Sequence, residues 1–452
     1  MNAYQKANSK LYLSVRNRLT RIFQPINIVP KDAKRKNQEI LSRSQRLMLE
    51  LGIIRQANPG SFHFLPLGVR ALDKLLHIVD EEMLKIGAQK VIFPTLTHSK
   101  LWKSTGRLED FGSELFTLTD RHNQMYILSP THEEAVSDLI ASVSQISYKE
   151  FPLKLYQTTN KYRDEIKPRF GLMRGRQFLM KDLYSFDIDL ESAKHTYDEV
   201  CDCYNAIFTK IGVPFHKVMG SVGAMGGSLS HEYHYKADIG EDQLMRCSDC
   251  GLHANIDLVG RDKCSNCNST NVTISNGIEV GHTFLLGDKY SKALKANYLN
   301  EKKKPISLQM GSYGLGLSRI LAAVVEVLSQ EEEMRWPLAL APYTAIIIPP
   351  KEGSKEEEAG YHLTERVCSL LETLPCLENN ILLDDRIHFT IGRRIIDARR
   401  VGYPFIIVIG SKCMEQMPLF ELVDLRRNTS INLNEEQLLL YFKEMFNNVH
   451  AS

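Results

Sequence analysis

The amino-acid sequence predicts an α+β fold in two parts, a large domain built around an antiparallel sheet and a smaller C-terminal α/β domain. Up to about residue 337, short apolar segments pair like hairpins and the helical segments lie apart from them. Beyond that point, short apolar strands alternate with helical segments, as in a small α/β domain. The length of 452 residues allows two to four domains, and 43% hydrophobic residues exclude a mainly disordered chain. No run approaches the ~18 consecutive apolar residues of a membrane-spanning helix, so no membrane partner is expected.

The first thirty residues differ in charge from the rest of the chain. They contain five basic residues and no acid, whereas the remainder has 51 basic and 54 acidic residues. Leu11, Val15, Leu19 and Ile22 recur at helical spacing among the arginines. A basic, acid-free, amphipathic N-terminus is typical of a mitochondrial transit peptide. We therefore expect residues 1–30 to direct the protein to the mitochondrial matrix; the alternative is a disordered basic arm that binds RNA.

The elements of the large domain, residues 31–337, follow from apolar periodicity and turn residues. Apolar side chains at helical spacing predict a long amphipathic helix at 69–86, closed by Gly87. A short strand at 90–94 follows, and two short segments form a hairpin around a polar turn. The hairpin strands are at 116–118 and 125–128; further strands are predicted at 155–162, 178–186 and 277–286, and helices at 191–211 and 320–328.

The C-terminal domain is expected to span residues 338–452, after a proline-rich boundary at Trp336-Pro337. Its apolar strands are short and alternate with helical segments, which predicts βαβ units. The strands are at 345–348, 381–383 and 405–409, and the helices at 356–372, 392–400 and 434–446.

Four of the nine cysteines form two closely spaced pairs, Cys247 with Cys250 and Cys264 with Cys267. Two C-x2-C pairs can place four thiolates tetrahedrally around Zn²⁺, and a closed site of this kind is structural because no position on the metal stays open. The intervening loop is slightly shorter than the usual ~15–20 residues. The alternative is two reduced pairs without metal.

An arginine-rich segment lies between the strands predicted at 155–162 and 178–186. Residues 161–181 contain seven basic side chains and two acidic ones. Guanidinium groups bind phosphate oxygens bidentately and stay charged, Gly171 and Gly175 allow the loop to bend around a ligand, and Phe178 can stack on a base. This pattern predicts a nucleotide-triphosphate site on a hairpin; the alternative is an exposed basic hairpin without a ligand.

A glycine-rich segment, 310–316, leads into the apolar helix predicted at 320–328. We expect a glycine-rich turn here, followed by a helix N-terminus that suits an anion, with Arg319 adding a phosphate contact. It is not a dinucleotide fingerprint, because Arg319 replaces the third glycine and no strong strand precedes it. The alternative is that the glycines serve only close helix packing.

Taken in order, these motifs resemble those of class II aminoacyl-tRNA synthetases, and specifically the prolyl-tRNA synthetase family in its mitochondrial form. The resemblance rests on Ser129-Pro130-Thr131-His132-Glu133-Glu134, the run from Tyr162 to Phe186, Gly277-Ile278-Glu279-Val280-Gly281-His282, and Gly311 to Arg319. It covers the chain from about residue 44 onward. It implies a class II antiparallel-sheet catalytic domain, a C-terminal α/β anticodon-binding domain, and a ligase that uses ATP with Mg²⁺ to join L-proline to tRNA(Pro) through prolyl-adenylate.

The resemblance also implies roles for individual residues. ATP would be held by Arg163, Glu165, Arg174, Phe178, Glu279 and Arg319, of which Arg163 and Arg319 are the catalytic candidates. Proline would be recognised by Thr131, Glu133, Arg163, His282 and Ser312. Phe93-Pro94 resembles the first class II motif, which forms the dimer interface, so a homodimer is expected.

Three of these residues have structural alternatives. Thr131 followed by Glu134 forms the pattern of a capping box at a helix start, which makes Glu133 the stronger binding candidate. His282 on a strand is equally well explained as a core histidine. Ser312 departs from the cysteine that is usual in the family, which puts a thiol's role there in doubt.

The C-terminal domain resembles the anticodon-binding domain of class IIa synthetases. Its basic patch at 386–400 contains one acid and five arginines, namely Arg386, Arg393, Arg394, Arg399 and Arg400. The resemblance implies that these bind tRNA, since arginines suit contacts with the nucleic-acid backbone. The alternative is a solvated arginine-rich helix.

Two rival functions remain at this point. The first is a synthetase for another amino acid, with threonine the nearest, which the segments around Thr131 and His282 oppose. The second is a non-catalytic relative that only binds nucleic acid or a partner, which the intact Arg163, Phe178 and Arg319 oppose.

Overall fold

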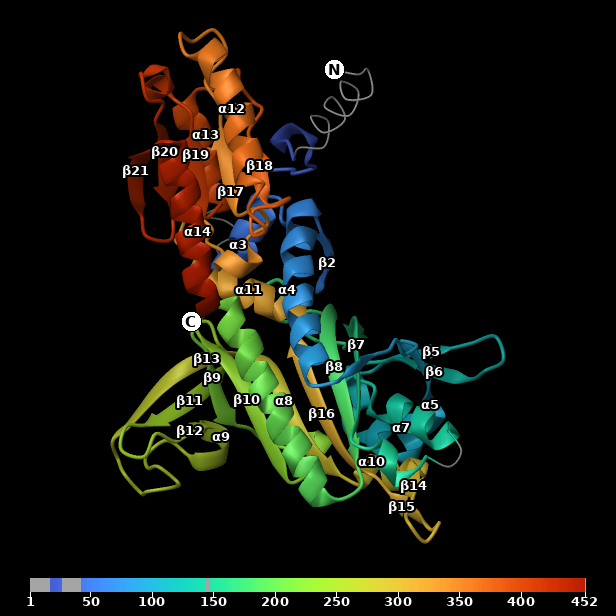
Figure 1. Ribbon diagram of the computed structural model, residues 1–452. Helices are drawn as coiled ribbons and strands as arrows, with labels where there is room; N and C mark the ends of the chain where they lie inside the picture. The colour runs from blue at the N-terminus through green and yellow to red at the C-terminus, as the bar shows by residue number, and fades with distance from the viewer. Residues whose placement is uncertain (1–16, 27–41, 144–145, 452) are drawn as a thin grey trace.

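The structure, a computed structural model, describes residues 17–26, 42–143 and 146–451. In Figure 1 the large domain lies below and the C-terminal domain above. Between them lie helices α3 (Arg43–Glu50) and α4 (Pro66–Lys85), the second of which is the long amphipathic helix predicted at 69–86. Within these residues, no helix combines the length and the apolar character needed to cross a membrane.

A nine-stranded, mainly antiparallel sheet forms the centre of the large domain, as predicted. Its order is β10-β9-β12-β11-β13-β16-β8-β7-β3, and β10 also pairs with β13. The strands are β3 (Gln89–Lys90), β7 (Leu153–Tyr162), β8 (Gln177–Asp187), β9 (His216–Met219), β10 (Leu229–Lys236), β11 (Asp242–Cys247), β12 (His253–Asn255), β13 (Val272–Gly287) and β16 (Gln309–Gly316). The long β13 pairs with β11 through its first part and with β10 through its second, while β16 runs along its other side.

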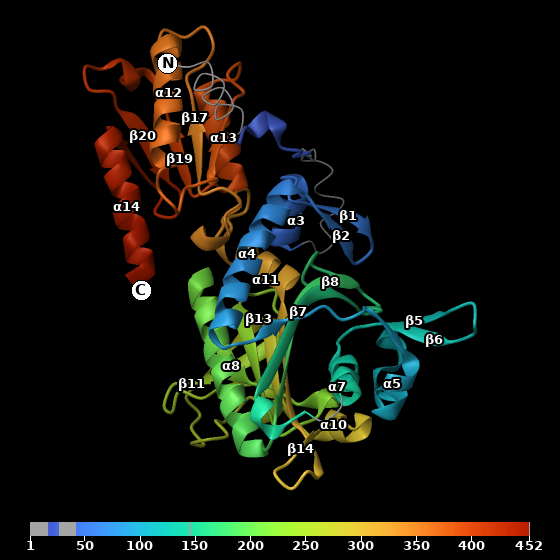
Figure 2. The same ribbon diagram turned by 45° about the vertical axis from the view of Figure 1, so that its right-hand side comes forward.

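Helices α8 (Leu190–Ile211) and α11 (Leu317–Leu328) pack against this sheet (Figure 2). Helix α8 begins where the Asp189 carboxylate accepts a hydrogen bond from the backbone N–H of Ser192 at 2.8 Å. It ends at Gly212, which has a φ of 80°. Because its apolar residues recur at helical spacing, α8 buries one face, including Tyr204 and Phe208, against the strands.

A smaller group of elements flanks the sheet on the right of Figure 1. It combines the three-stranded sheet β4-β6-β5 with short helices, and it includes the predicted hairpin at 116–128. The elements are β4 (Leu96–His98), α5 (Ser99–Ser104), α6 (Arg107–Phe111), η2 (Gly112–Glu114), β5 (Phe116–Thr119), β6 (Met125–Leu128), α7 (Glu133–Ser142), η3 (Tyr148–Glu150) and α10 (Lys289–Leu294).

Two further hairpins pair β1 (Ile54–Asn58) with β2 (Ser61–Phe64) and β14 (Asn297–Leu299) with β15 (Pro305–Ser307). The short elements η4 (Gly223–Met225) and α9 (Ile256–Val259) lie in the connections of the large sheet.

The C-terminal domain is a five-stranded sheet of order β18-β17-β19-β20-β21 with three helices. The three predicted strands, β17 (Ala345–Ile348), β18 (Ile381–Leu383) and β19 (Phe405–Val408), are parallel. The antiparallel hairpin of β20 (Phe420–Asp424) and β21 (Thr429–Leu433) was not predicted, because β21 is a mostly exposed edge strand of largely polar residues. The helices are α12 (Glu357–Leu371), α13 (Ile391–Val401) and α14 (Glu435–Ala451).

The prediction of a glycine-rich turn before α11 is wrong, because this segment is the central strand β16. The side chain of Tyr313 folds over the backbone of Gly311, so that a Cβ at Gly311 would lie 2.1 Å from the Tyr313 hydroxyl. The glycine leaves room for the Tyr313 side chain of the same strand and for Ser185 of β8, rather than allowing a bend.

Residues 17–26, here named the N-terminal strap, lie against both domains. At the C-terminal domain, the backbone N–H of Leu383 donates to Asn17 O at 2.9 Å, and Thr20 Oγ1 donates to Asp385 at 2.6 Å. At the large domain, the side chain of Gln24 donates to the Leu51 carbonyl at 2.8 Å. The predicted transit segment thus includes ten residues that pack on the folded body, while residues 1–16 and 27–30 lie outside the described residues.

Candidate active site

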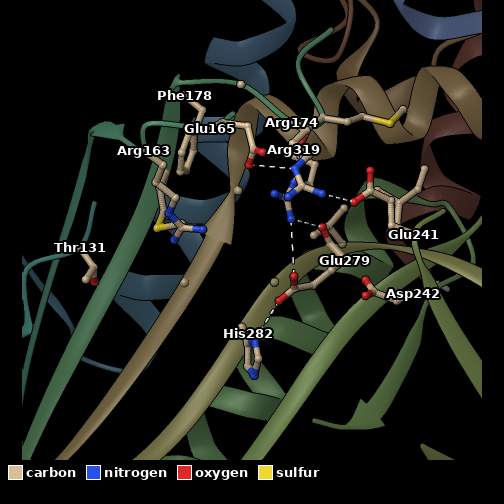
Figure 3. Close-up of a pocket in the computed structure, with 18 of the residues that line it drawn as sticks. Thr131, Arg163, Glu165, Arg174, Phe178, Glu241, Asp242, Glu279, His282 and Arg319 are labelled. Atoms are coloured by element: carbon tan, nitrogen blue, oxygen red, sulfur yellow. Dashed lines mark hydrogen bonds and ion pairs between the residues drawn. The ribbon is translucent and has the colours of Figure 1, made fainter. Parts of the chain in front are cut away.

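A polar cavity of about 490 Å³ is lined by strands β8, β13 and β16 together with the loop between β7 and β8 (Figure 3). Ten side chains predicted from the sequence line it: Thr131, Glu133, Arg163, Glu165, Arg174, Phe178, Glu279, His282, Ser312 and Arg319. The fold therefore brings all of the predicted ATP-binding and proline-binding residues into one cavity.

Arg163 follows β7 and enters the cavity beside Phe178 (Figure 3). Its Nε is buried without a hydrogen-bond partner, and no ion pair within the described part of the chain involves its side chain. Its guanidinium carbon lies 5.3 Å from the centroid of the Phe178 ring. Burial, followed by repulsion from Arg319, lowers the pKa of Arg163. A half-buried guanidinium without a counter-ion suits an anionic ligand.

The loop between β7 and β8 is held in shape by ion pairs. Arg174 Nε lies 2.8 Å from Glu165 Oε2, and its NH1 lies 2.5 Å from Glu241 Oε2. Arg176 Nε donates to the backbone carbonyl of Glu165 at 2.9 Å. Burial would raise the pKa of Glu165, but the hydrogen bond from Arg174 lowers it. The loop therefore presents a fixed carboxylate next to the ring of Phe178.

Arg319, on the first turn of α11, faces Glu279 across the cavity (Figure 3). Its Nε donates to Met173 O at 2.8 Å and its NH1 to Glu279 O at 2.9 Å. His282 Nδ1 lies 2.8 Å from Glu279 Oε1, and its Nε2 lies 2.7 Å from Ser230 Oγ. Burial alone would raise the pKa of Glu279, but His282 and Arg319 hold it well below its usual range. His282 is thus an oriented part of the cavity wall rather than a core residue.

Glu133 forms the innermost, fully buried end of the cavity. The hydroxyl of Thr131 lies 2.8 and 2.7 Å from its two carboxylate oxygens, Ser312 Oγ donates to Oε1 at 2.8 Å, and Arg107 NH1 donates to Oε2 at 3.0 Å. Burial would raise the pKa of Glu133, but Arg107 and the two hydroxyl donors lower it. The Glu133 side chain therefore keeps its negative charge although no water surrounds it.

The capping-box alternative for Thr131 and Glu134 is not realised. The residue before α7 is His132, and no side chain caps the helix. The Thr131 hydroxyl instead bonds to Glu133, so Thr131 belongs to the binding end of the cavity.

Asp242, on β11, faces the same part of the cavity as Glu279 (Figure 3). Burial, followed by repulsion from Glu279, raises the pKa of Asp242 to about 6. Carboxylate oxygens are the ligands that Mg²⁺ prefers, together with substrate phosphates. The donor set of this wall therefore fits a magnesium ion.

Four free cysteines form a separate cluster at the end of β11, outside the cavity. Cys247 Sγ lies 3.6 Å from Cys267 Sγ, Cys250 Sγ lies 3.5 Å from Cys264 Sγ, and all four sulfur atoms lie within 4.8 Å of one another. Tetrahedral Zn²⁺ with Zn–S bonds of about 2.3 Å separates its sulfur ligands by about 3.8 Å. The arrangement of the four thiols therefore fits one Zn²⁺ ion.

Comparisons with known proteins agree with this geometry. The family model described as "tRNA synthetase class II core domain (G, H, P, S and T)" matches residues 116–328, and "Anticodon binding domain" matches residues 344–445. The chain is 48% identical over 409 residues to the probable mitochondrial proline–tRNA ligase of Homo sapiens, covering 89% of this chain and 86% of that protein. The chain belongs to the prolyl-tRNA synthetase family.

Other members of the prolyl-tRNA synthetase family cover the chain as fully. The probable mitochondrial proline–tRNA ligase of Rattus norvegicus is 44% identical over 438 residues, 96% of this chain and 91% of that protein. The proline–tRNA ligase of Ehrlichia canis is 35% identical over 421 residues, 89% of this chain and 95% of that protein. A prolyl-tRNA synthetase structure from Cryptosporidium parvum has a TM-score of 0.73 at 17% identity, covering 90% of this chain and 75% of that chain. The predicted class II fold with an anticodon-binding domain is confirmed.

The arginines predicted to bind tRNA are mostly engaged inside the synthetase. Arg386 pairs with Asp384 and Asp397, Arg393 pairs with Asp397, Arg399 pairs with Glu333, and Arg400 lies 3.7 Å from Glu50. Arg394 is fully buried and donates to the carbonyls of Asp384 and Pro349. We therefore correct Arg394 from a tRNA contact to a structural residue, because no ligand on the surface can reach it.

Sequence reasoning missed Arg107, Ser230, Glu241 and Asp242 at the synthetase's cavity and its inner end. The first three act through predicted residues, Arg107 through Glu133, Ser230 through His282 and Glu241 through Arg174, whereas Asp242 lines the cavity beside Glu279. None stands in a distinctive motif, and a single arginine in a polar stretch gives no sign that it will be buried.

Proposed function

We propose that this synthetase attaches L-proline to tRNA(Pro) in two steps, with ATP as co-substrate and prolyl-adenylate as intermediate. The observation that carries the proposal is the unpaired Arg163, which lies between Phe178 on one side and Thr131 on the other (Figure 3). One cation there can hold an α-phosphate and an amino-acid carboxylate together, which aligns the two reactants. Relatives at 44–48% identity are named mitochondrial proline–tRNA ligases, which supports the assignment.

ATP is assigned to the side of the cavity formed by the loop between β7 and β8. Phe178 stacks on the adenine, and Glu165 accepts a hydrogen bond from its amino group. Arg174 and Arg319 contact the outer phosphates from two sides of the cavity. Glu279 and Asp242 would hold Mg²⁺, which would neutralise the charge of the phosphates.

Proline is assigned to the inner end of the cavity. Its protonated secondary amine carries two N–H groups; Glu133 accepts one, and the lone pairs of the Thr131 hydroxyl accept the other. Ser312 holds the Glu133 carboxylate in place, and His282 forms the pocket wall. The proline carboxylate then points towards Arg163.

The reaction requires no nucleophile from the protein. A carboxylate oxygen of proline attacks the α-phosphorus of ATP, the bond to the bridging oxygen breaks, and pyrophosphate leaves. The terminal ribose hydroxyl of tRNA then attacks the prolyl carbonyl, and AMP leaves with the bonding electron pair. Arg163 and Arg319 act by position and charge, which is what phosphoryl chemistry demands.

The anticodon arm of tRNA(Pro) is assigned to the loop between β18 and α13. Arg393 is the most exposed of the predicted arginines, with 57% of its side chain accessible. The exposed rings of His388 and Phe389 lie beside it, with centroids 4.2 Å apart. Aromatic rings next to arginines are suited to unstacked bases in a single-stranded loop. Arg386, Arg399 and Arg400 contribute only where tRNA competes with their acidic partners.

A structural Zn²⁺ ion bound by Cys247, Cys250, Cys264 and Cys267 is part of the proposal. The short sulfur–sulfur distances support it, since four thiols this close are stabilised by a shared cation.

A homodimer is proposed from the region of the first class II motif. Three large apolar side chains near edge strand β3 are exposed, namely Leu84, Ile92 and Leu96. Exposed apolar residues grouped in this way mark interaction surfaces, and a second copy of the chain is the occupant that the family resemblance implies.

Mitochondria are the proposed location, with the matrix as the compartment. The mitochondrial names of the relatives support this. We propose that any removed transit segment ends before Asn17 rather than at residue 30, because the N-terminal strap makes hydrogen bonds with both domains.

The test is ATP–pyrophosphate exchange with each amino acid in turn, followed by charging of tRNA(Pro). Exchange that depends on proline, together with prolyl-tRNA formation, is the expected result. Exchange with threonine would indicate the same scaffold with a different specificity. No exchange with any amino acid, from enzyme whose unfolding is cooperative, would overturn the proposal in favour of a non-catalytic relative.

A further inference from the structure

Arg107 is a fully buried guanidinium that makes no direct contribution to the cavity wall. It is the first residue of α6, and its guanidinium carbon lies 4.8 Å from the ring centroids of both Trp102 and Phe111 and 5.3 Å from that of Tyr290. Rings on several sides fix the plane of the guanidinium and exclude water from it. Such a side chain has one orientation.

That orientation is directed at two adjacent carboxylates. Arg107 NH1 lies 3.0 Å from Glu133 Oε2 and 3.1 Å from both oxygens of Glu134. Glu134 is also buried, and it accepts a hydrogen bond from Thr105 at 2.9 Å on the side away from the cavity. One cation therefore serves two acids, of which only Glu133 lines the cavity.

The charges at the inner end of the cavity can be compared directly. Nearby Lys161 and Asp182 form a buried pair of their own at 2.7 Å and cancel each other. Burial, followed by repulsion from Lys161, lowers the pKa of His132 to about 4, so this ring is neutral at pH 7. What remains is one guanidinium shared by two acids. Burial, reinforced by Glu133 and opposed by Arg107, raises the pKa of Glu134, whereas Arg107 and the hydroxyl donors lower that of Glu133. The acid that lines the cavity therefore holds its negative charge more firmly, and a cationic substrate group can balance it.

Three side chains hold the Glu133 carboxylate. Arg107, Thr131 and Ser312 each hydrogen-bond to it, and Arg107 lowers its pKa against the opposing effect of burial. Glu133 is therefore fixed in orientation and charged, as an acceptor for the N–H of a substrate ammonium group must be.

We infer that Arg107 and Glu134 are positioning residues for amino-acid recognition: Arg107 fixes the Glu133 carboxylate and keeps it charged, and Glu134 holds the Arg107 guanidinium in place, so that this end of the cavity selects a cationic amine. The inference rests on the proposed function, and it goes beyond it by naming residues that control the charge of the amine site without touching the substrate. It predicts that the enzyme distinguishes proline from uncharged molecules of similar shape by the charge of the amine, since shape alone discriminates weakly between them.

The experiment compares two ligands of similar shape in five enzymes. Proline carries an ammonium group in its ring, whereas cyclopentanecarboxylate has a carbon in its place and serves as a competitive inhibitor. The enzymes are the wild type, Glu134→Gln, Arg107→Lys, Arg107→Met and the control Asp110→Asn, which removes an exposed acid from the same helix α6. The measured quantities are the KM for proline and for ATP, the kcat of exchange, and the inhibition constant of cyclopentanecarboxylate.

We expect Glu134→Gln to raise the KM for proline about tenfold or more, with the KM for ATP and the inhibition constant of cyclopentanecarboxylate changed less than about twofold. Arg107→Lys keeps the charge without the fork geometry, so it raises the KM for proline less than Arg107→Met does. Asp110→Asn leaves all constants unchanged.

If Glu134→Gln loses affinity equally for proline and for cyclopentanecarboxylate, the inference is overturned, since that result indicates a distorted cavity rather than a weakened charge interaction with the amine. So would an unchanged KM for proline. If Arg107→Met does not fold, Glu134→Gln and Arg107→Lys still decide the question. A wild-type enzyme without proline-dependent exchange would instead refute the proposed function, so the two failures are distinguishable.

Discussion

Arg163 and Arg319 approach the same cavity with different supports. Arg319 is held by the carbonyls of Met173 and Glu279 and by an ion pair of 3.6 Å with the Glu279 carboxylate. Arg163 has no acidic partner in the described part of the chain, and its position depends on packing beside Phe178. Arg163 therefore gains most from a bound anion, and its loss should affect chemistry more than stability.

Replacing Arg163 with Ala should reduce the rate of proline-dependent exchange by at least about 10²–10³-fold, because one fixed cation on the reacting phosphate is lost. The midpoint of thermal unfolding should not fall, since the half-buried guanidinium that is removed has no acidic partner in the described part of the chain. The matched control is Lys167→Ala in the same loop, an exposed lysine that should leave the exchange rate unchanged. Exchange kinetics and calorimetry check both parts, and an active Arg163→Ala enzyme would contradict the assignment.

At this scale the sequence predicted residues that the structure brings into one cavity, but not those that support them. Arg163, Phe178 and Glu279 stand in long motifs, and the structure places them in one cavity. Arg107 could not be found, because its role depends on three rings and two carboxylates that approach it only in the fold. Arg394 was misassigned because composition does not distinguish a surface arginine from a buried one.

Among the elements, strand β13 links two parts of the molecule. Its first residues pair with β11 next to Cys247, and Glu279 and His282 lie further along the same strand. The cysteine cluster thus anchors one end of a strand whose other part lines the cavity.

The purified enzyme should contain about one Zn²⁺ per chain, measured by mass spectrometry of the metal content. Cys250→Ser and Cys264→Ser should each lose the metal and lower the midpoint of thermal unfolding by about 5 °C or more, because metal binding and folding are coupled. Cys376→Ser, a cysteine outside the cluster, is the control. Wild-type enzyme without zinc after purification free of chelators would contradict this prediction.

The sequence predicted most elements where apolar periodicity is strong, as in α4, α8 and the three parallel strands of the C-terminal domain. It failed at β16, and it missed helix α7, strands β9 to β12 of the large sheet, and the hairpin of β20 and β21. Strand β16 contains three glycines, so its local preference favours a turn, and pairing with β8 and β13 overrides that preference. Strand β21 is polar and exposed, so it lacks the alternation that identifies a strand.

For the whole molecule, the proposed homodimer gives a direct test. Ile92→Asp places a charge on a side chain that is 83% exposed in the isolated chain. If a second copy covers it, burying that charge is costly, and the variant should be monomeric in analytical ultracentrifugation while the wild type is dimeric. Met417→Asp, an exposed apolar residue of the C-terminal domain, is the control and should leave the dimer intact. A monomeric wild type would refute the proposal.

The N-terminal strap should stabilise the contact between the two domains. Deleting residues 1–16 should leave thermal unfolding unchanged, whereas deleting residues 1–26 should lower the midpoint by a few degrees, because it removes hydrogen bonds to Leu383, Asp385 and Leu51. Asp385→Ala should reproduce part of the effect. Identical unfolding of the two shortened enzymes would show that the strap contributes nothing.

The strap also affects how this enzyme is best produced. A recombinant protein that starts at residue 31, the boundary suggested by charge alone, lacks every strap contact with both domains. Charging rates measured on that protein would then combine the intrinsic chemistry with altered freedom of the anticodon-binding domain. The choice of starting residue is therefore an experimental variable in any study of communication between anticodon and active site, and residue 17 is the safer choice.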